Sequence, residues 1–265
     1  MTPTDPHRPD PHSLALLALA VAREQGADEA AQTRLGRALL GPDSPTSGPE
    51  PAEPVLVLTA RSDDEDAEVV CLPGLTLAAG PDWLLRACER LSPEELTLAS
   101  SLLRLARQHG HEAARSTGES VLFAGAEAPE IGDSTAVGVS EDPDDRRDLA
   151  ARCPADDVAA AGLPAWDAAA ALVPDDGAGT ALQACVAAAG HRVRGGLLAD
   201  LGVLVVPRLR ERGLGAYAAA VACERAWLDG LVPTARVPVQ AQAAHQTAVA
   251  VGLAPVGHVA GLRLT

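Results

Sequence analysis

Residues 196–230, GLLADLGVLVVPRLRERGLGAYAAAVACERAWLDG, join an apolar run to a glycine-containing turn and an alanine-rich segment. The run Leu197–Val206 predicts a strand that stops at Pro207, and residues 214–229 predict a helix. Where a strand leads into a helix in this way, the first N–H groups of the helix lack internal partners and the helix dipole adds positive charge. The stretch therefore predicts an anion-binding turn.

The turn itself is rich in glycine and arginine. Gly213 and Gly215 let the backbone approach a ligand closely, because no side chain stands in the way. Arg208, Arg210 and Arg212 can add charge-assisted hydrogen bonds to phosphate oxygens. These residues favour a pyrophosphate as the bound anion, and the simpler alternative is an ordinary helix start with a glycine cap.

The segment Arg210-Glu211-Arg212-Gly213-Leu214-Gly215 fits the signature R/Q-x-x-G-x-G/A and follows the strand directly. In this segment and in the order of elements around it, residues 150–265 resemble the GNAT superfamily of N-acetyltransferases. The downstream elements that carry the resemblance are helix 214–229, strand 235–239, helix 243–251, Gly252-Leu253 and strand 256–264.

The resemblance implies a domain that binds acetyl-CoA as a co-substrate and transfers its acetyl group to a primary amine of a small molecule or protein. No covalent acyl-enzyme is involved in that family. The pantetheine arm would pair with the backbone of Val203, Leu204 and Val205. The pyrophosphate would lie on the N–H groups of Arg210, Glu211, Arg212, Gly213, Leu214 and Gly215.

The catalytic groups are harder to find in the sequence. Many family members carry N-x-x-S-x-x-x-Y on the helix after the penultimate strand, and here Ala241, Ala244 and Ala248 occupy those positions. The usual acid, the tyrosine, is therefore replaced by Ala248. Asp200 is the candidate base, with a solvent-facing carboxylate as the simpler interpretation.

Three functions remain open at this level. The first is an active N-acetyltransferase in which water protonates the thiolate. The second is a catalytically degenerate relative that binds CoA as a sensor or scaffold. The third is another nucleotide-binding domain with the same anion turn, although the absence of lysine excludes a P-loop.

The charge of the chain is concentrated in its first half. The first 150 residues hold 27 acidic residues against 12 arginines, while residues 151–265 hold nine of each. A domain of this sign repels nucleic acid and anionic membranes and attracts a cationic amine acceptor. Solubility alone is the other explanation.

The remaining composition predicts a soluble cytoplasmic protein without a metal. Five cysteines, Cys71, Cys88, Cys153, Cys185 and Cys223, are widely spaced and read as reduced, mostly buried thiols. The N-terminal residues MTPTDPHRPDPHS have no basic region followed by an apolar core, so we expect no signal peptide, and the apolar stretch 14–22 is too short to span a bilayer. His191 and His245 are expected on the surface. The oligomeric state stays open.

We expect an α/β (α+β) fold with a mixed, mostly antiparallel sheet flanked by helices. The predicted organisation is a disordered tail 1–12, an acidic α/β domain 13–148 and an acetyl-CoA-binding domain 149–265, with the boundary in the turn-like run 140–148. The first domain is either a degenerate copy of the second or an unrelated partner.

The segments of this expected fold follow from apolar periodicity and turn residues. In the first half they are helices 13–25, 28–40, 82–91 and 92–108, the hairpin strands 55–59 and 68–72 around an acidic tip 63–66, and a strand 120–124. In the second half they are helix 155–162 and the strands 181–193 and 197–206 around Gly195-Gly196.

Overall fold

The structure is a computed structural model that describes residues 11–40, 55–62, 66–132, 137–174 and 184–265. It contains two compact units. The first comprises residues 1–123, 236–241 and 255–265, and the second comprises residues 124–235 and 242–254. The predicted tail up to residue 10, the connection 41–54 and most of the acidic tip lie outside the described residues.

The first unit is a sheet covered by five helices of its described part. Its strand order is β1-β3-β2-β10-β4, with β1 and β3 parallel and β2 antiparallel to both β3 and β10. Its core consists of leucine, alanine, valine, the two cysteines Cys71 and Cys88 and one tryptophan, Trp83. The elements are α1 (Pro11–Glu24), α2 (Glu29–Leu40), β1 (Val55–Ala60), β2 (Ala67–Leu72), β3 (Leu75–Gly80), α3 (Asp82–Cys88), α4 (Pro93–Leu96), α5 (Ala99–Gln108), β4 (Arg115–Gly125) and β10 (Leu253–Arg263).

Two predictions in this unit need correction. The strands at 55 and 68 do not form a hairpin, because β3, which sequence analysis missed, pairs with both of them. The predicted helix 92–108 is two helices, interrupted at Thr97 and Leu98. Its predicted start is confirmed, since Ser92 and Glu95 form a complete capping box.

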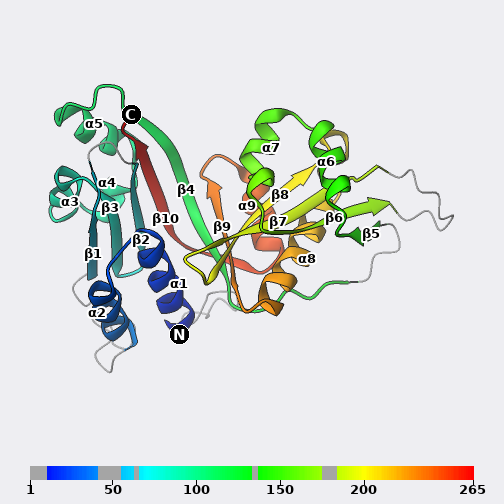
Figure 1. Cartoon of the computed structure of the whole chain (residues 1–265), viewed down its shortest axis with the longest axis horizontal. Helices are drawn as coiled ribbons and strands as arrows, with labels where there is room; N and C mark the ends of the chain where they lie inside the picture. The colour runs from blue at the N-terminus through cyan, green and yellow to red at the C-terminus, as the bar shows by residue number, and fades with distance from the viewer. Residues whose placement is uncertain (1–10, 41–54, 63–65, 133–136, 175–183) are drawn as a thin grey trace, which may run out of the picture. The chain divides into compact units, whose positions relative to one another are not determined.

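The second unit is a sheet whose strands lie side by side in the order in which they follow along the chain, with helices on both faces (Figure 1). Its order is β5-β6-β7-β8-β9, antiparallel except for the parallel pair β8–β9. On one face α8 packs on β6, β7 and β8, while α6 and α7 cover the other. The elements are β5 (Val137–Ser140), α6 (Pro143–Ala151), α7 (Ala155–Ala161), β6 (Ala168–Pro174), β7 (Ala187–Arg194), β8 (Leu198–Val205), α8 (Leu214–Leu228), β9 (Val232–Pro238) and α9 (Gln242–Ala250).

The acidic run 140–148 is a helix start and not a turn. Asp142 accepts a hydrogen bond from the N–H of Asp144 at 2.9 Å, and Pro143 occupies the first helical position of α6. The strands β5 and β6 were also missed. The predicted hairpin at Gly195-Gly196 is confirmed, because both glycines have positive φ, 56° and 74°, between β7 and β8.

The predicted mixed, mostly antiparallel α/β fold is confirmed. The compact units differ in extent from the predicted domains, because β10 pairs with β2 and so the end of the chain belongs to the first unit. Where independently folding domains begin stays a prediction. The first unit does not repeat the consecutive strand order of the second, and its origin as a copy stays a hypothesis.

An open strand edge beside a cradle of N–H groups

Strands β8 and β9 start as neighbours and then separate. Their register comprises three pairs, Leu198 with Val232, Ala199 with Pro233 and Asp200 with Thr234. Strand β8 continues for five more residues, 201–205, that have no partner in β9. Among the described residues no strand pairs with this edge of β8 over its second half, and an open edge can pair with an extended ligand.

Alternation along β8 decides which backbone groups face this edge. The carbonyl of Leu197 accepts from the N–H of Val232 at 2.9 Å, whereas the N–H of Val206 donates to Val186 on the opposite side at 3.0 Å. The odd-numbered residues of β8 therefore direct their backbone groups to the β9 side: Val203 and Val205 to the open edge, and Leu201 with its carbonyl, since its N–H belongs to the last pair with β9. Leu204, also predicted to bind pantetheine, pairs with Ala188 of β7.

The open edge leads into the predicted anion turn. Among the described residues, no acceptor is within hydrogen-bonding reach of the N–H groups of residues 211–216. Gly213 is the N-cap of α8, with φ 79° and ψ −8°. A left-handed residue followed by a helical one turns successive N–H groups toward one point, which makes an anion-binding concavity. The turn is exposed up to Gly213.

Gly215 lies where α8 passes closest to β8. A Cβ atom on Gly215 would lie 3.4 Å from Cγ2 of Val205, 3.7 Å from Cγ1 of Val203 and 4.0 Å from Oγ1 of Thr247 in α9. Gly215 thus faces the side chains of Val203 and Val205 and not open solvent, whereas a Cβ atom on Gly213 would meet no protein atom within 4 Å. The lack of a side chain at Gly215 lets the start of α8 lie close to β8.

The three arginines of the turn have different surroundings. Arg210 donates from Nε to the carbonyl of Val205 at 3.3 Å, and its guanidinium forms a 2.6 Å ion pair with Asp157 of α7. Arg208 and Arg212 are exposed, and no carboxylate in the described part of the chain pairs with either. The charge available to an incoming anion therefore belongs to Arg208 and Arg212.

The candidate base Asp200 forms an ion pair with Arg194 at 3.0 Å, and both side chains are about four-fifths buried, with exposed fractions of 20% and 18%. It lies at the last pair before β8 and β9 separate, opposite Thr234. Its role as a base stays a prediction. In that role the Asp200 carboxylate would have to accept the proton of the amine while paired with Arg194. Ala248, at the expected tyrosine position, is buried.

Trp166 packs on two glycines where β8 lies against α7. Gly190 and Gly202 are directly paired between β7 and β8. The indole of Trp166 lies over both, and its Nε1 donates to the carbonyl of Ala161 at 3.0 Å. A Cβ atom on Gly202 would come within 1.9 Å of that carbonyl oxygen. This packing fixes the strand whose next residues form the open edge.

The histidine and thiol predictions have mixed outcomes. His191 is buried, with 2% of its surface exposed, so its predicted surface position is wrong. Burial lowers its pKa, while Asp229 and Asp167 act in the opposite direction. The prediction of mostly buried cysteines is confirmed, since four of the five are buried, and their reduced state stays a prediction. Burial raises the pKa of Cys223 to about 12, and such a thiol is protonated and unreactive near neutral pH.

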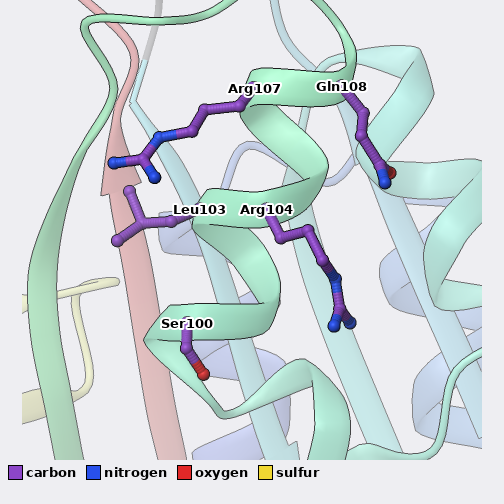
Figure 2. Close-up of a pocket in the computed structure, with 5 residues that line it drawn as sticks. All are labelled: Ser100, Leu103, Arg104, Arg107 and Gln108. Carbon is purple, nitrogen blue, oxygen red and sulfur yellow. The ribbon is translucent and has the colours of Figure 1, made fainter.

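A separate hollow of about 520 Å³ lies on α5 in the first unit. It is lined by Ser100, Leu103, Arg104, Arg107 and Gln108 (Figure 2). The two arginine side chains extend to different sides of the helix, so they do not converge on one point. None of these residues belongs to the turn or to β8.

Two further observations concern the described residues as a whole. No group of three or more histidine, cysteine, aspartate or glutamate side chains is placed to hold a metal ion in the described ranges. No helix within those ranges is long and apolar enough to cross a membrane.

Comparisons with known proteins give likenesses of fold. No protein-family model matches the chain, and no curated protein matches it significantly. An acetyltransferase from the GNAT family from Colwellia psychrerythraea is 12% identical, with 57% of each chain covered and a TM-score of 0.40. A GCN5-related N-acetyltransferase from Kribbella flavida is 17% identical, with 61% of this chain and 62% of that chain covered and a TM-score of 0.41.

A GCN5-related N-acetyltransferase-like protein from Streptococcus suis 89/1591 matches over more of the chain. It is 13% identical, with 93% of this chain and 98% of that chain covered and a TM-score of 0.46. In contrast, the chain spans less than two thirds of the length of the Colwellia and Kribbella proteins. At these identities and TM-scores, what the chain binds has to follow from its own site.

Proposed function

We propose that the protein is an acetyl-CoA-dependent N-acetyltransferase whose cofactor site is the turn 210–215 together with the open edge of β8. The observation that carries the proposal is the continuity of the two features. An extended amide-containing arm can pair with Leu201 and Val203 while its pyrophosphate lies on the N–H groups that follow. ATP and NAD offer an anion to the cradle but have no extended amide arm for the edge.

In this proposal the reaction occurs near the point where β8 and β9 separate. A cofactor anchored by its pyrophosphate at Gly213 and running back along β8 brings its thioester toward the point where β8 and β9 separate. The first free N–H of β8 on the open edge, beyond the pair of Asp200 with Thr234, is that of Val203, and it can donate to the thioester carbonyl oxygen as that oxygen gains charge. The amine nitrogen attacks the carbonyl carbon, the C–S bond breaks, the nitrogen loses one proton to water, and the thiolate takes one proton from water.

A CoA-binding protein without turnover is the second candidate. Ala248 is buried, and Asp200 is in an ion pair with Arg194. No tyrosine acid is therefore available at the usual place, and the best candidate base has a cation beside it. Both observations favour slow chemistry, while neither weakens the case for binding.

A panel of acceptors separates these two candidates and tests the character of the acceptor. We expect acetyl transfer, followed as release of free CoA, with a polyamine or aminoglycoside and little with acidic amines. Raising the ionic strength from about 0.02 to about 0.3 M should raise KM for the cationic acceptor and change acetyl-CoA affinity less, because salt screens attraction to the acidic half.

Two other results of this acceptor panel would contradict part of the proposal. A salt-independent KM, or a faster reaction with a neutral or acidic acceptor, would show that the acidic half serves solubility only. Binding of acetyl-CoA with no turnover of any acceptor would leave the CoA-binding sensor or scaffold as the function.

A further inference from the structure

We infer that Asp157 is a positioning residue for the cofactor site: through Arg210 it holds the turn in the shape that gathers the N–H groups. The inference rests on the proposed function and adds a residue from outside the sequence signature. Asp157 lies in α7, 53 positions before Arg210, and accepts a hydrogen bond from the guanidinium of Arg210.

The turn needs an outside support because one of its residues has an unfavourable backbone conformation. Glu211 has φ 64°, and it is the one non-glycine residue with positive φ in the described part of the chain. A side chain of this size rarely adopts that region unless its surroundings hold it there. No described group accepts a hydrogen bond from the N–H of Glu211 or of Arg212. The nearest backbone hydrogen bonds of the described residues join Arg210 to Pro207 and Tyr217 to Gly213, so a side-chain contact made by Arg210 adds support close to Glu211.

Arg210 supplies that support from the residue immediately before. Its Nε donates to the carbonyl of Val205 at 3.3 Å, which ties the turn to the last residue of β8. Its terminal nitrogen donates to Oδ2 of Asp157 at 2.6 Å, which fixes the guanidinium plane. Without Asp157 the long arginine side chain is free to leave Val205 and turn to solvent.

We call the contacts of Arg210 with Asp157 and with the Val205 carbonyl the clamp. The clamp also limits which part of the open edge can pair with a ligand. The carbonyl of Val205 faces the open edge and is occupied by Arg210, so the acceptors left for an extended ligand are those of Leu201 and Val203. Arg210 thus marks where pairing along β8 ends and where the anion cradle begins.

Two physical effects of removing the Asp157 charge have opposite signs. A carboxylate near an anion site repels the ligand, so electrostatics alone predicts that Asp157→Asn binds acetyl-CoA more tightly. Loss of the clamp predicts weaker binding, because the N–H groups are no longer held in place before the ligand arrives. The direction of the change therefore reports the mechanism.

The experiment compares Asp157→Asn with Asp156→Asn by titration calorimetry with acetyl-CoA. Asp156 is the adjacent residue, is exposed and has no ion pair with a described residue, so its substitution removes the same charge without touching the clamp. We expect Asp157→Asn to weaken binding by about fivefold, the size of coupling usual between contacting side chains. Asp156→Asn should leave affinity unchanged or slightly higher, and Asp157→Glu should restore most of the loss.

A second measurement uses the free protein. The Nε–H of Arg210, identified by its disappearance in Arg210→Lys, should exchange slowly with water in the wild type and rapidly in Asp157→Asn. In an Arg210→Ala background, Asp157→Asn should have no further effect on acetyl-CoA affinity, because the residue through which it acts is gone.

Equal affinities of Asp157→Asn and Asp156→Asn, or tighter binding by the former, would overturn the inference. If the wild type itself binds no acetyl-CoA, the proposed function fails. The rate at which the Nε–H proton of Arg210 exchanges with water then shows whether Asp157 holds Arg210 in place. Fast exchange of that proton on substitution of Asp157 supports the clamp, and unchanged exchange overturns it.

Discussion

Replacing Gly215 with valine should weaken acetyl-CoA binding by at least about tenfold, or about 1.4 kcal/mol, while the protein stays folded. The first carbon of the new side chain would already lie 3.4 Å from Val205 and 3.7 Å from Val203, and the two methyl groups would extend farther. They would fill the space between the N–H cradle and the open edge of β8, through which an extended ligand has to pass.

Gly213→Ala is a second variant of the turn. Its Cβ atom would meet no protein atom within 4 Å, but the residue has φ 79°, so the substitution strains the backbone by about 1 kcal/mol. We expect Gly213→Ala to lower both the melting temperature and the affinity, because the strain disturbs the N–H groups proposed to bind the pyrophosphate. Wild-type affinity in a folded Gly215→Val protein would mean that the ligand does not pass between α8 and β8.

Gly202→Ala should destabilise the protein by about 3 kcal/mol or more, the upper end of the cost of overpacking. The added carbon would lie 1.9 Å from the carbonyl oxygen of Ala161 and 2.7 Å from Nε1 of Trp166. One of these neighbours is backbone of α7, so no rotamer change relieves the clash. Denaturant unfolding followed by circular dichroism measures the loss.

Gly138→Ala is the control for this stability measurement. It also lies in a strand of the second unit, but its nearest neighbour would be the carbonyl of Val173 at 4.0 Å. We expect a change of about 0.5 kcal/mol or less, as for a surface substitution that touches no special feature. A Gly202→Ala protein as stable as Gly138→Ala would contradict the packing of Trp166 over the paired glycines.

The local pattern of the sequence predicted the elements around the site well. The strand–turn–helix order of 196–230, the two glycines of the hairpin and the capping box at Ser92 are confirmed, because each depends on residues a few positions apart. The sequence did not reveal β3 although its six residues are all buried, because a short apolar run does not show with which strands it pairs. The helix α6 was signalled by Asp142 and Pro143, and its acidic composition obscured that signal.

What the sequence could not predict at the site depends on contacts between distant residues. The register of β8 with β9 ends at Asp200, and only this register shows which half of β8 is open. The partner of Arg210 lies 53 residues away, in a helix with no signature of its own. The burial of His191 likewise follows from its position in a strand packed under α8, and not from its sequence neighbours.

Calorimetric melting in the presence of acetyl-CoA tests the central claim most directly. If the turn 210–215 and the edge of β8 form the cofactor site, saturating acetyl-CoA should stabilise the native protein by about 2–4 kcal/mol and raise its melting temperature. ATP and NAD at the same concentrations should produce no comparable shift, and Gly215→Val should lose most of the shift caused by acetyl-CoA. An unchanged melting temperature at millimolar acetyl-CoA would contradict the account.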